Sequence, residues 1–295
     1  MNKYIYYPGC SLKSSGKHYE ESIISVFKEM GIELEEMEDW NCCGATASPS
    51  VDFLKTAIIN GRNLSIAEKA GKNIVAPCAA CYLGLKKSNE FLLKDTKETE
   101  SILNELEKAG YPYKGTVSIK HPVEVLTNEV GLDQIKEKVE RKLTGLRVAN
   151  YYGCQIVRPF EDFDDPDYPV IMDNLIEALG ATSVDFNAKT ICCGGALSAN
   201  LEKAGVMLNY KILKEAKRKE ADAIITLCPL CLFNLEIMQN KIVKKYKEDI
   251  KTPVLFFSQL LGLALGIPQE ELGFSRSLIP LKSFWKKLEN GGKNE

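Results

Sequence analysis

Residues 74–81 read IVAPCAAC and residues 224–231 read IITLCPLC, so a short β-rich run ends in a Cys-x-x-Cys twice in one chain. The sequence around the other cysteines repeats as well. Residues 5–10 (IYYPGC) resemble residues 149–154 (ANYYGC), and residues 42–45 (CCGA) resemble residues 192–195 (CCGG). Agreement at so many positions indicates an internal duplication rather than chance.

All ten cysteines belong to this repeat, and each set of five has the order C…CCG…CxxC. The first set comprises Cys10, Cys42, Cys43, Cys78 and Cys81, and the second comprises Cys154, Cys192, Cys193, Cys228 and Cys231. In both sets 34 residues separate the cysteine pair from the Cys-x-x-Cys. The first cysteine is separated from the pair by 31 residues in the first set and by 37 residues in the second. The six additional residues of the second set fall around residues 158–169, which we expect to form a loop insertion.

Short β-rich runs alternate with helical stretches along the chain, which predicts βαβ units and a parallel sheet in each half. The predicted strands are 4–7, 32–36, 73–76, 116–120, 147–151, 182–186, 223–227 and 254–257. The predicted helices are 18–30, 51–70, 82–94, 170–179, 199–219 and 230–247. The expected fold is therefore α/β, with two duplicated Rossmann-like domains related by a pseudo-twofold axis.

We place the domain boundary between residues 144 and 145, so that each domain, 1–144 and 145–295, contains one cysteine set. The charged stretch 133–142 is the expected linker, and the tail from Arg276 onward is expected to be peripheral. Every cysteine group follows a predicted strand. Because the carboxyl ends of parallel strands lie at one edge of the sheet, five thiols are expected to gather at that edge in each domain.

The composition excludes several classes of protein. A net charge of −2 gives no electrostatic support for binding nucleic acid. The longest apolar candidate, residues 254–267, is shorter than the roughly 18 residues that a membrane span needs. The amino terminus lacks the apolar core of a signal peptide. We therefore expect a cytoplasmic protein without a membrane span, and in that reducing compartment ten cysteines are not expected to form structural disulfides.

Five thiols exceed the four ligands of a structural zinc site and the four of an ordinary [4Fe–4S] cube. The fifth indicates a larger or opened iron–sulfur arrangement, or a reserve ligand. Zinc sites and buried free thiols remain the alternatives. No G-x-G-x-x-G or phosphate-binding loop is present, so we expect no flavin or nicotinamide in this chain, and electrons must come from a partner.

The double motif resembles the CCG-domain, cysteine-rich family, and within it the heterodisulfide reductase B subunits of methanogenic archaea. The resemblance implies one noncubane [4Fe–4S] cluster on each five-cysteine set. It also implies reduction of the coenzyme M–coenzyme B disulfide to two thiols. The implied partners are a ferredoxin-like iron–sulfur C subunit, a flavin-containing A subunit, and a hydrogenase or formate dehydrogenase module.

A second interpretation from the same family remains open. CCG subunits of succinate-, glycolate- and lactate-oxidising complexes look similar, and such a protein would relay electrons to a quinone or another subunit without disulfide chemistry. The completeness of both motifs favours the heterodisulfide reductase.

Four residues outside the cysteine sets are candidates for the site. His121 follows a predicted strand, and an imidazole with a pKa of about 6.5 suits proton donation to a departing thiolate. Lys13, Lys17 and Arg158 follow the first cysteine of each set, and they are candidates to bind the anionic ends of the disulfide. Solvated surface charges and an ordinary packed histidine are the alternatives.

Overall fold

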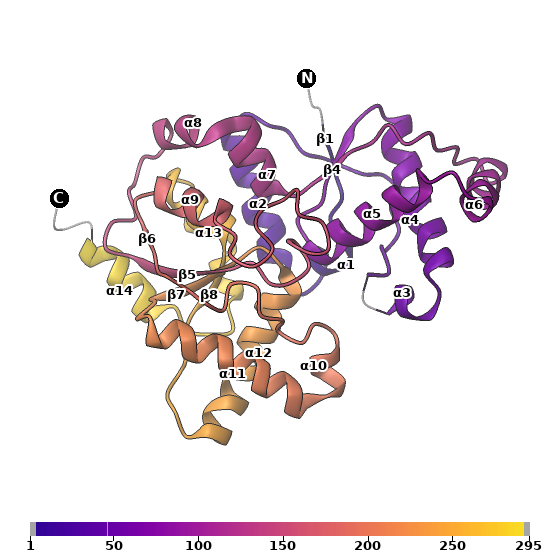
Figure 1. Ribbon diagram of the computed structural model, residues 1–295. Coiled ribbons are helices and arrows are strands. Elements are labelled where there is room, and N and C mark those ends of the chain that lie inside the picture. The colour runs from indigo at the N-terminus through magenta and orange to yellow at the C-terminus, as the bar shows by residue number, and fades with distance from the viewer. Residues whose placement is uncertain (1–3, 46, 292–295) are drawn as a thin grey trace.

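The computed structural model describes residues 4–45 and 47–291 and has two four-stranded parallel sheets. Their strand orders are β2-β1-β3-β4 and β6-β5-β7-β8, so the second half repeats the first. The predicted α/β fold with two similar halves is confirmed. Figure 1 shows the amino-terminal half, in indigo and purple, beside the carboxyl-terminal half, in orange and yellow.

The first half contains the following elements: β1 (Tyr4–Tyr6), α1 (Gly9–Leu12), α2 (Lys17–Glu29), β2 (Glu35–Glu36), α3 (Ser48–Val51), α4 (Phe53–Lys69), β3 (Asn73–Val75), α5 (Ala79–Leu92), α6 (Lys97–Lys108), β4 (Ile119–Lys120), α7 (Pro122–Glu124), η1 (Val125–Gly131) and α8 (Leu132–Glu137). In its sheet, Ile5 pairs with Glu35 on one side and with Ile74 on the other. The central strands β1 and β3 are buried, whereas β2 is an exposed edge.

The second half contains these elements: β5 (Arg147–Tyr151), α9 (Ile171–Ala178), β6 (Thr182–Ser183), α10 (Leu197–Asn200), α11 (Glu202–Arg218), β7 (Ala223–Thr226), α12 (Pro229–Tyr246), β8 (Val254–Phe256), α13 (Phe257–Ala264), η2 (Gln269–Leu272), η3 (Phe274–Arg276) and α14 (Lys282–Gly291). Val148 pairs with Ser183 and with Ala223. Residues 158–169, all within the described part of the chain, form no helix or strand, as expected of a loop insertion.

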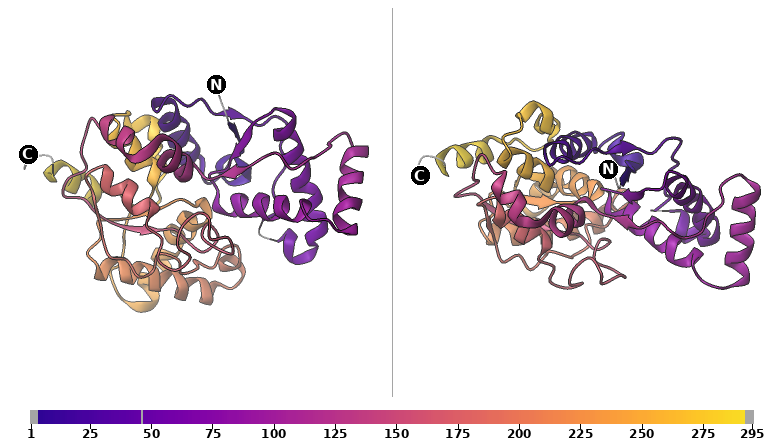
Figure 2. Two further views of the ribbon diagram at one scale, coloured as in Figure 1. Left: turned by 45° about the horizontal axis from the view of Figure 1, so that its top comes forward. Right: turned by 90° about the horizontal axis from the view of Figure 1, so that it is seen from above.

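Helix α2 connects the two halves, because it packs against the second half rather than only on its own sheet. The Tyr19 ring stacks on Phe256, with centroids 4.0 Å apart, and Ser22 Oγ lies 2.6 Å from Ser258 Oγ. One continuous hydrophobic cluster includes buried residues of both sheets. Figure 2 shows the halves side by side. The division at residues 144 and 145 remains a prediction.

The structure gives the conformation of the expected linker and of most of the expected tail. The predicted linker is partly helical, because α8 occupies its first residues. Of the expected peripheral tail, residues 292–295 lie outside the described part of the chain; Phe284 in α14 is fully buried, and its ring lies 6.4 Å from that of Phe274. Arg276 also forms an ion pair with Glu21 of α2. The tail therefore contributes apolar burial and a charge contact to the fold.

Candidate metal centres

The first cysteine set gathers where β1, β2 and β3 end. Cys10 lies in α1, Cys42 and Cys43 lie in the loop after β2, and Cys78 and Cys81 flank the start of α5. The Sγ atoms of Cys10 and Cys42 are 3.8 Å apart, and those of Cys43 and Cys81 are 3.3 Å apart. The structure therefore brings thiols from three separate segments together, as the strand positions predicted.

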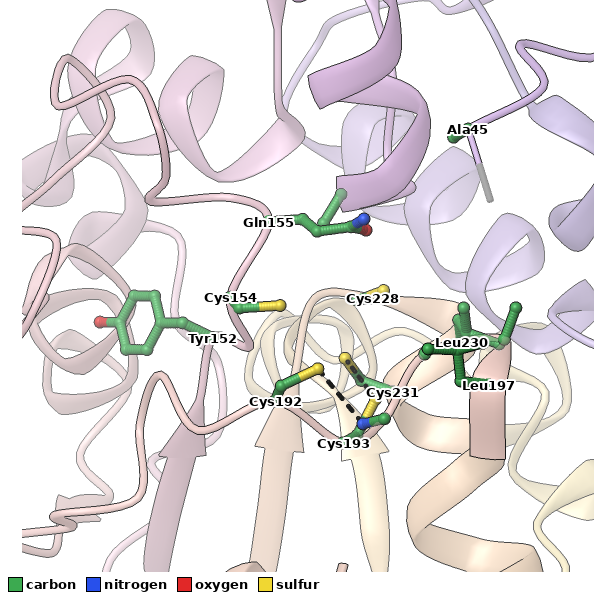
Figure 3. A pocket seen from close by; sticks show the side chains of 14 residues that line it. Ala45, Tyr152, Cys154, Gln155, Cys192, Cys193, Leu197, Cys228, Leu230 and Cys231 are labelled. Atoms are coloured by element: carbon green, nitrogen blue, oxygen red, sulfur yellow. Dashed lines mark hydrogen bonds between the residues drawn. The ribbon is translucent and has the colours of Figure 1, made fainter. Parts of the chain in front are cut away.

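The second set has the same arrangement at the ends of β5, β6 and β7. The Sγ atoms of Cys193 and Cys231 are 3.6 Å apart, and the backbone N–H of Gly194 donates to Cys192 Sγ at 3.3 Å. In Figure 3 the side chains of Cys154, Cys192 and Cys228 extend towards a common space. The duplication in sequence is thus a duplication of thiol geometry.

A glycine before the first cysteine of each set allows this close approach. Gly9 and Gly153 both have positive φ angles, of 63° and 73°. A Cβ atom on Gly9 would lie 2.7 Å from Cys81 Sγ, and one on Gly153 would lie 3.0 Å from Cys231 Sγ. Any larger residue would therefore displace a thiol, in addition to straining the backbone.

The two sets meet at the Cys-x-x-Cys loops. Cys78 and Cys228 are each 3% exposed, and the carbonyls of the residues before them, Pro77 and Leu227, lie 2.8 and 3.3 Å from one atom, His121 Nε2. Contact with Cys228 raises the pKa of Cys78 well above its usual value. Hydrogen bonds from Cys231 and Cys78 lower the pKa of Cys228. The ten thiols therefore form two sets with one shared boundary.

Within each set, neighbouring thiols also shift one another's pKa values. A hydrogen bond from Cys42 lowers the pKa of Cys43 to about 4, and the proximity of Cys43 raises that of Cys81. In the second set, a hydrogen bond from Cys154 lowers the pKa of Cys192 to about 6. Some thiols are thus ionised while their neighbours stay protonated. Because nearby thiolates repel one another, all five thiols of a set are ionised together only when cations are bound.

The donor set fits a soft, sulfur-bound metal centre. Thiolate ligands suit iron–sulfur clusters and zinc. Among the residues that the structure describes, no three Cys, His, Asp or Glu side chains are grouped to hold a single metal ion. Five sulfur donors in each set fit a centre with several metal ions better than one tetrahedral ion.

Three asparagines that the sequence motifs did not reveal support the cysteine pairs. Asn60 Nδ2 donates to the carbonyl of Cys43 at 3.3 Å, and Asn209 Nδ2 donates to that of Cys193 at 2.9 Å. Asn234 Nδ2 lies 3.4 Å from Cys193 Sγ itself. Asn60 and Asn209 stand 17 and 16 residues after the second cysteine of their pairs, and this similar spacing is the signal that could have found them.

Two tyrosines hold the cysteine-pair loops in place. The hydroxyl of Tyr7 donates to the carbonyl of Asn41 at 2.8 Å, and that of Tyr151 donates to the carbonyl of Ile191 at 2.7 Å. Each carbonyl belongs to the residue immediately before a cysteine pair. The hydroxyls therefore bind backbone next to the ligands and orient the loops.

A buried ion pair anchors the loop before Cys154, and sequence patterns gave no indication of it. Lys189 Nζ lies 2.9 Å from Asp173 Oδ1, and the Tyr152 hydroxyl donates to Asp173 Oδ2 at 2.6 Å. The carbonyl of Lys189 accepts the backbone N–H groups of Tyr152 and Gly153 at 2.9 and 3.0 Å. Side chain and backbone of one lysine thus position the residues that lead into the second set.

His121 lies at the end of β4, as predicted, and is fully buried. Its Nδ1 accepts the N–H of Val123 at 3.2 Å, and its Nε2 lies 2.8 Å from the carbonyl oxygen of Pro77. Burial lowers the pKa of His121 to about 4, so the ring is neutral near pH 7. Proton donation by His121 remains a prediction, and the engagement of both ring nitrogens does not favour it.

The three predicted cations are held by carboxylates. Lys13 Nζ lies 2.6 Å from oxygens of both Glu20 and Glu36, and Lys17 also pairs with Glu20. Arg158 forms an ion pair of 2.9 Å with Asp167, besides hydrogen bonds to nearby oxygens. None of the three is among the described residues that line the cavity beside the second set. Substrate binding by them remains a prediction.

A cavity of about 240 Å³ lies beside the second set, at the junction of the two halves. Its described lining residues are Ala45, Ala79, Tyr152, Cys154, Gln155, Cys192, Cys193, Gly194, Gly195, Ala196, Leu197, Cys228, Leu230 and Cys231. Figure 3 shows Ala45 of the first half across from Leu197 and Leu230 of the second, with the ring of Tyr152 turned away. The cavity is therefore mostly apolar apart from thiols and one amide.

Two parallel sheets with a C…CCG…CxxC set at each carboxyl edge define a duplicated cysteine-rich protein. The family model CCG, described as a cysteine-rich domain, matches residues 4–86 and 148–236. The chain belongs to this family.

Relatives match over nearly the whole chain. The 8-methylmenaquinol:fumarate reductase membrane anchor subunit of Wolinella succinogenes is 35% identical, over 95% of this chain and 98% of its own length. The B subunit of the ferredoxin/F420H2-dependent CoB-CoM heterodisulfide reductase of Methanosarcina acetivorans is 31% identical, over 98% and 97%. A protein of Archaeoglobus profundus, described as like the heterodisulfide reductase B subunit, is also 31% identical, over 92% and 93%.

A solved structure supports the fold. A hypothetical protein from Helicobacter pylori aligns with a TM-score of 0.74 at 15% identity, covering 94% of this chain and 52% of that one. Taken with the family match, the relatives support an iron–sulfur electron-transfer subunit of the oxidoreductase class. Among residues 4–45 and 47–291, no helix is both long and apolar enough to cross a membrane.

Proposed function

We propose that this chain is the iron–sulfur redox subunit of a multi-subunit oxidoreductase, with one noncubane [4Fe–4S] cluster on each five-cysteine set. The junction of the two Cys-x-x-Cys loops carries the proposal, because His121 Nε2 contacts the carbonyls of both Pro77 and Leu227, the residues before Cys78 and Cys228. Such clusters, when bound, accept and release single electrons. In this proposal the chain itself supplies ten thiolate ligands, of which Cys78 and Cys228 are buried where the two sets adjoin.

The exposed thiols indicate where a partner docks. Cys10 and Cys42 are exposed, whereas Cys78 and Cys81 are buried. The first set therefore faces solvent on one side and adjoins the second set on its other side. In this proposal a ferredoxin-like C subunit, supplied by a flavin-containing A subunit and a hydrogenase or formate dehydrogenase module, exchanges electrons at such a face. The proposed location is the cytoplasm, where thiols stay reduced and available to metal.

The lining of the cavity favours an apolar redox substrate such as a quinol. Ala45, Ala79, Leu197 and Leu230 contribute apolar surface, and the described lining contains no Lys, Arg or His. Oxidation of a quinol releases two electrons and two protons, and the two centres that the cysteine sets would hold could each take up one electron. The W. succinogenes relative, named for 8-methylmenaquinol, agrees with this substrate class.

Reduction of the coenzyme M–coenzyme B disulfide is the second candidate. It is favoured by the arrangement of two like centres on either side of one junction, since a disulfide takes up two electrons and two protons to give two thiols. Its sulfonate and phosphate need cations. The three predicted cations are paired with carboxylates, and they would have to break these ion pairs to bind the sulfonate or phosphate: Lys13, Lys17 and Arg158. Otherwise the anionic groups would have to bind elsewhere.

One anaerobic experiment tests both candidates. The purified protein should contain roughly eight iron atoms and matching sulfide per chain, with EPR signals from two centres. The oxidised protein is then mixed with a naphthoquinol, and the reduced protein with the coenzyme disulfide. Reduction by the quinol, without reoxidation by the disulfide, supports the first candidate. Reoxidation by the disulfide alone, with a KM raised by Arg158→Met, selects the second. Zinc in place of iron contradicts the proposal.

A further inference from the structure

One imidazole touches the backbone of both Cys-x-x-Cys loops. His121 Nε2 lies 2.8 Å from the carbonyl oxygen of Pro77 and 3.3 Å from that of Leu227. The Nδ1 atom accepts the N–H of Val123, so the ring proton is on Nε2, between the two carbonyls. The Nε2–H group of His121, at the end of β4, is therefore shared by the carbonyls of Pro77 and Leu227, the residues that precede Cys78 and Cys228.

Tyr19 of α2 adds a second donor to this connection. Its hydroxyl donates to the carbonyl of Leu227 at 3.2 Å and lies 3.5 Å from His121 Nε2. The Tyr19 ring is fully buried and stacks on Phe256, with an angle of 6° between the planes. Four segments, the ends of β3, β4 and β7 together with α2, thus converge within one hydrogen-bonded group.

Resting on the proposed function, we infer that His121 is a positioning residue that, with Tyr19, fixes the separation and orientation of the two cysteine sets. Pro77 and Leu227 immediately precede Cys78 and Cys228, so a shift of either carbonyl moves a ligand. Because electron exchange between two centres depends steeply on their separation, this link sets how strongly the centres interact. It acts through hydrogen-bond donation alone and requires no change of protonation.

The alternative is that His121 only fills space in the core. The rings of Tyr82, Phe163 and Phe257 surround it, with centroids 6.1–6.3 Å away. A packing role predicts that an apolar residue of similar size would serve as well. A positioning role predicts that a donor must remain, because without it the Pro77 carbonyl loses the His121 donor and the Leu227 carbonyl keeps only the Tyr19 hydroxyl.

Three variants separate these roles. His121→Leu keeps an apolar side chain but removes the donor. His121→Gln retains an amide N–H near the position of Nε2, although it lacks an imidazole. Tyr19→Phe deletes one hydroxyl and preserves the stacked ring.

The measurement is the magnetic interaction between the two reduced centres, seen as splitting or broadening in EPR spectra of the iron-loaded protein. Cys43→Ala, which removes a ligand of the first set, provides the spectrum of an isolated second centre. We expect His121→Leu to keep both centres' iron but to lose much of the interaction, Tyr19→Phe to lose part of it, and His121→Gln to retain it.

An unchanged interaction in His121→Leu, with both centres loaded, would overturn the inference. If His121→Leu does not fold, Tyr19→Phe decides: an unchanged spectrum overturns the inference, and a weakened interaction supports it. Loss of turnover in His121→Gln with the interaction intact would instead assign His121 to proton transfer. A wild-type protein without two iron centres would refute the proposed function, a result distinct from any change among the variants.

Discussion

Replacing Lys189 by Met tests how far the second cysteine set depends on one buried ion pair. The Lys189 and Asp173 side chains are 3% and 11% exposed. Removing one partner of a buried pair costs about 3–5 kcal/mol, because the other charge stays buried without compensation. Asp173 keeps hydrogen bonds from Tyr152 and Ser183, so we expect the lower end of that range, about 3 kcal/mol, in the free energy of unfolding.

The same substitution should affect metal binding in one half only. The Lys189 carbonyl accepts from the two residues before Cys154, and loss of the side-chain anchor loosens that loop. Urea unfolding followed by circular dichroism measures stability, and EPR with iron analysis measures the occupancy of each centre. We expect the second centre to lose iron and the first to keep it.

Two further variants act as controls for Lys189→Met. Lys108→Met breaks an exposed pair with Glu105 and should leave stability unchanged within error. Lys189→Met combined with Asp173→Asn removes both charges and should recover part of the loss. The reasoning is refuted if Lys189→Met is no more destabilising than Lys108→Met, or if both centres lose iron equally.

Three other predictions concern the ligands, the response to acid and the potential of one centre. Cys43→Ala and Cys193→Ala should each lower the iron content by about half, with the remaining EPR signal coming from the untouched half; equal loss from both halves would show that the sets are not independent. Burial lowers the pKa of His18 to about 4. Between about pH 6.5 and pH 4 the unfolded chain therefore binds a proton at His18 that the folded protein does not. The free energy of unfolding should fall by roughly 3 kcal/mol over this range. His18→Phe should remove this part of the acid sensitivity in urea titrations, and an undiminished pH dependence would exclude His18 as its source. Asn234→Ala removes a hydrogen-bond donor from Cys193 Sγ. The equivalent position of the first set, 41 residues after Cys43, is Gly84, which has no such donor. The reduction potential of the second centre alone should therefore fall by about 40 mV if the hydrogen bond contributes about 1 kcal/mol. An EPR redox titration measures it, and a shift of both centres would be inconsistent with a local hydrogen bond.

The cysteine repeat and its place in the fold followed from sequence, because both are local. A β-rich run that ends in a cysteine marks the end of a strand, and parallel strands bring their carboxyl ends to one edge. The strands are shorter than expected at the exposed sheet edge, where β2 contains only Glu35 and Glu36. There, few side chains are buried to define where a strand begins.

Only the tertiary structure decided how the two halves meet and which side chains support the thiols. The contact of His121 with the carbonyls of both Pro77 and Leu227 depends on how the two halves, joined by α2, pack together. Helix packing joins residues more than 100 positions apart, as Tyr19 and Leu227 show, and no sequence period encodes such a pairing. The ion-pair partners of the predicted cations could not be read from sequence for the same reason: Lys13 and Arg158 stand beside the predicted sites in the chain, but their carboxylate partners are set by folding.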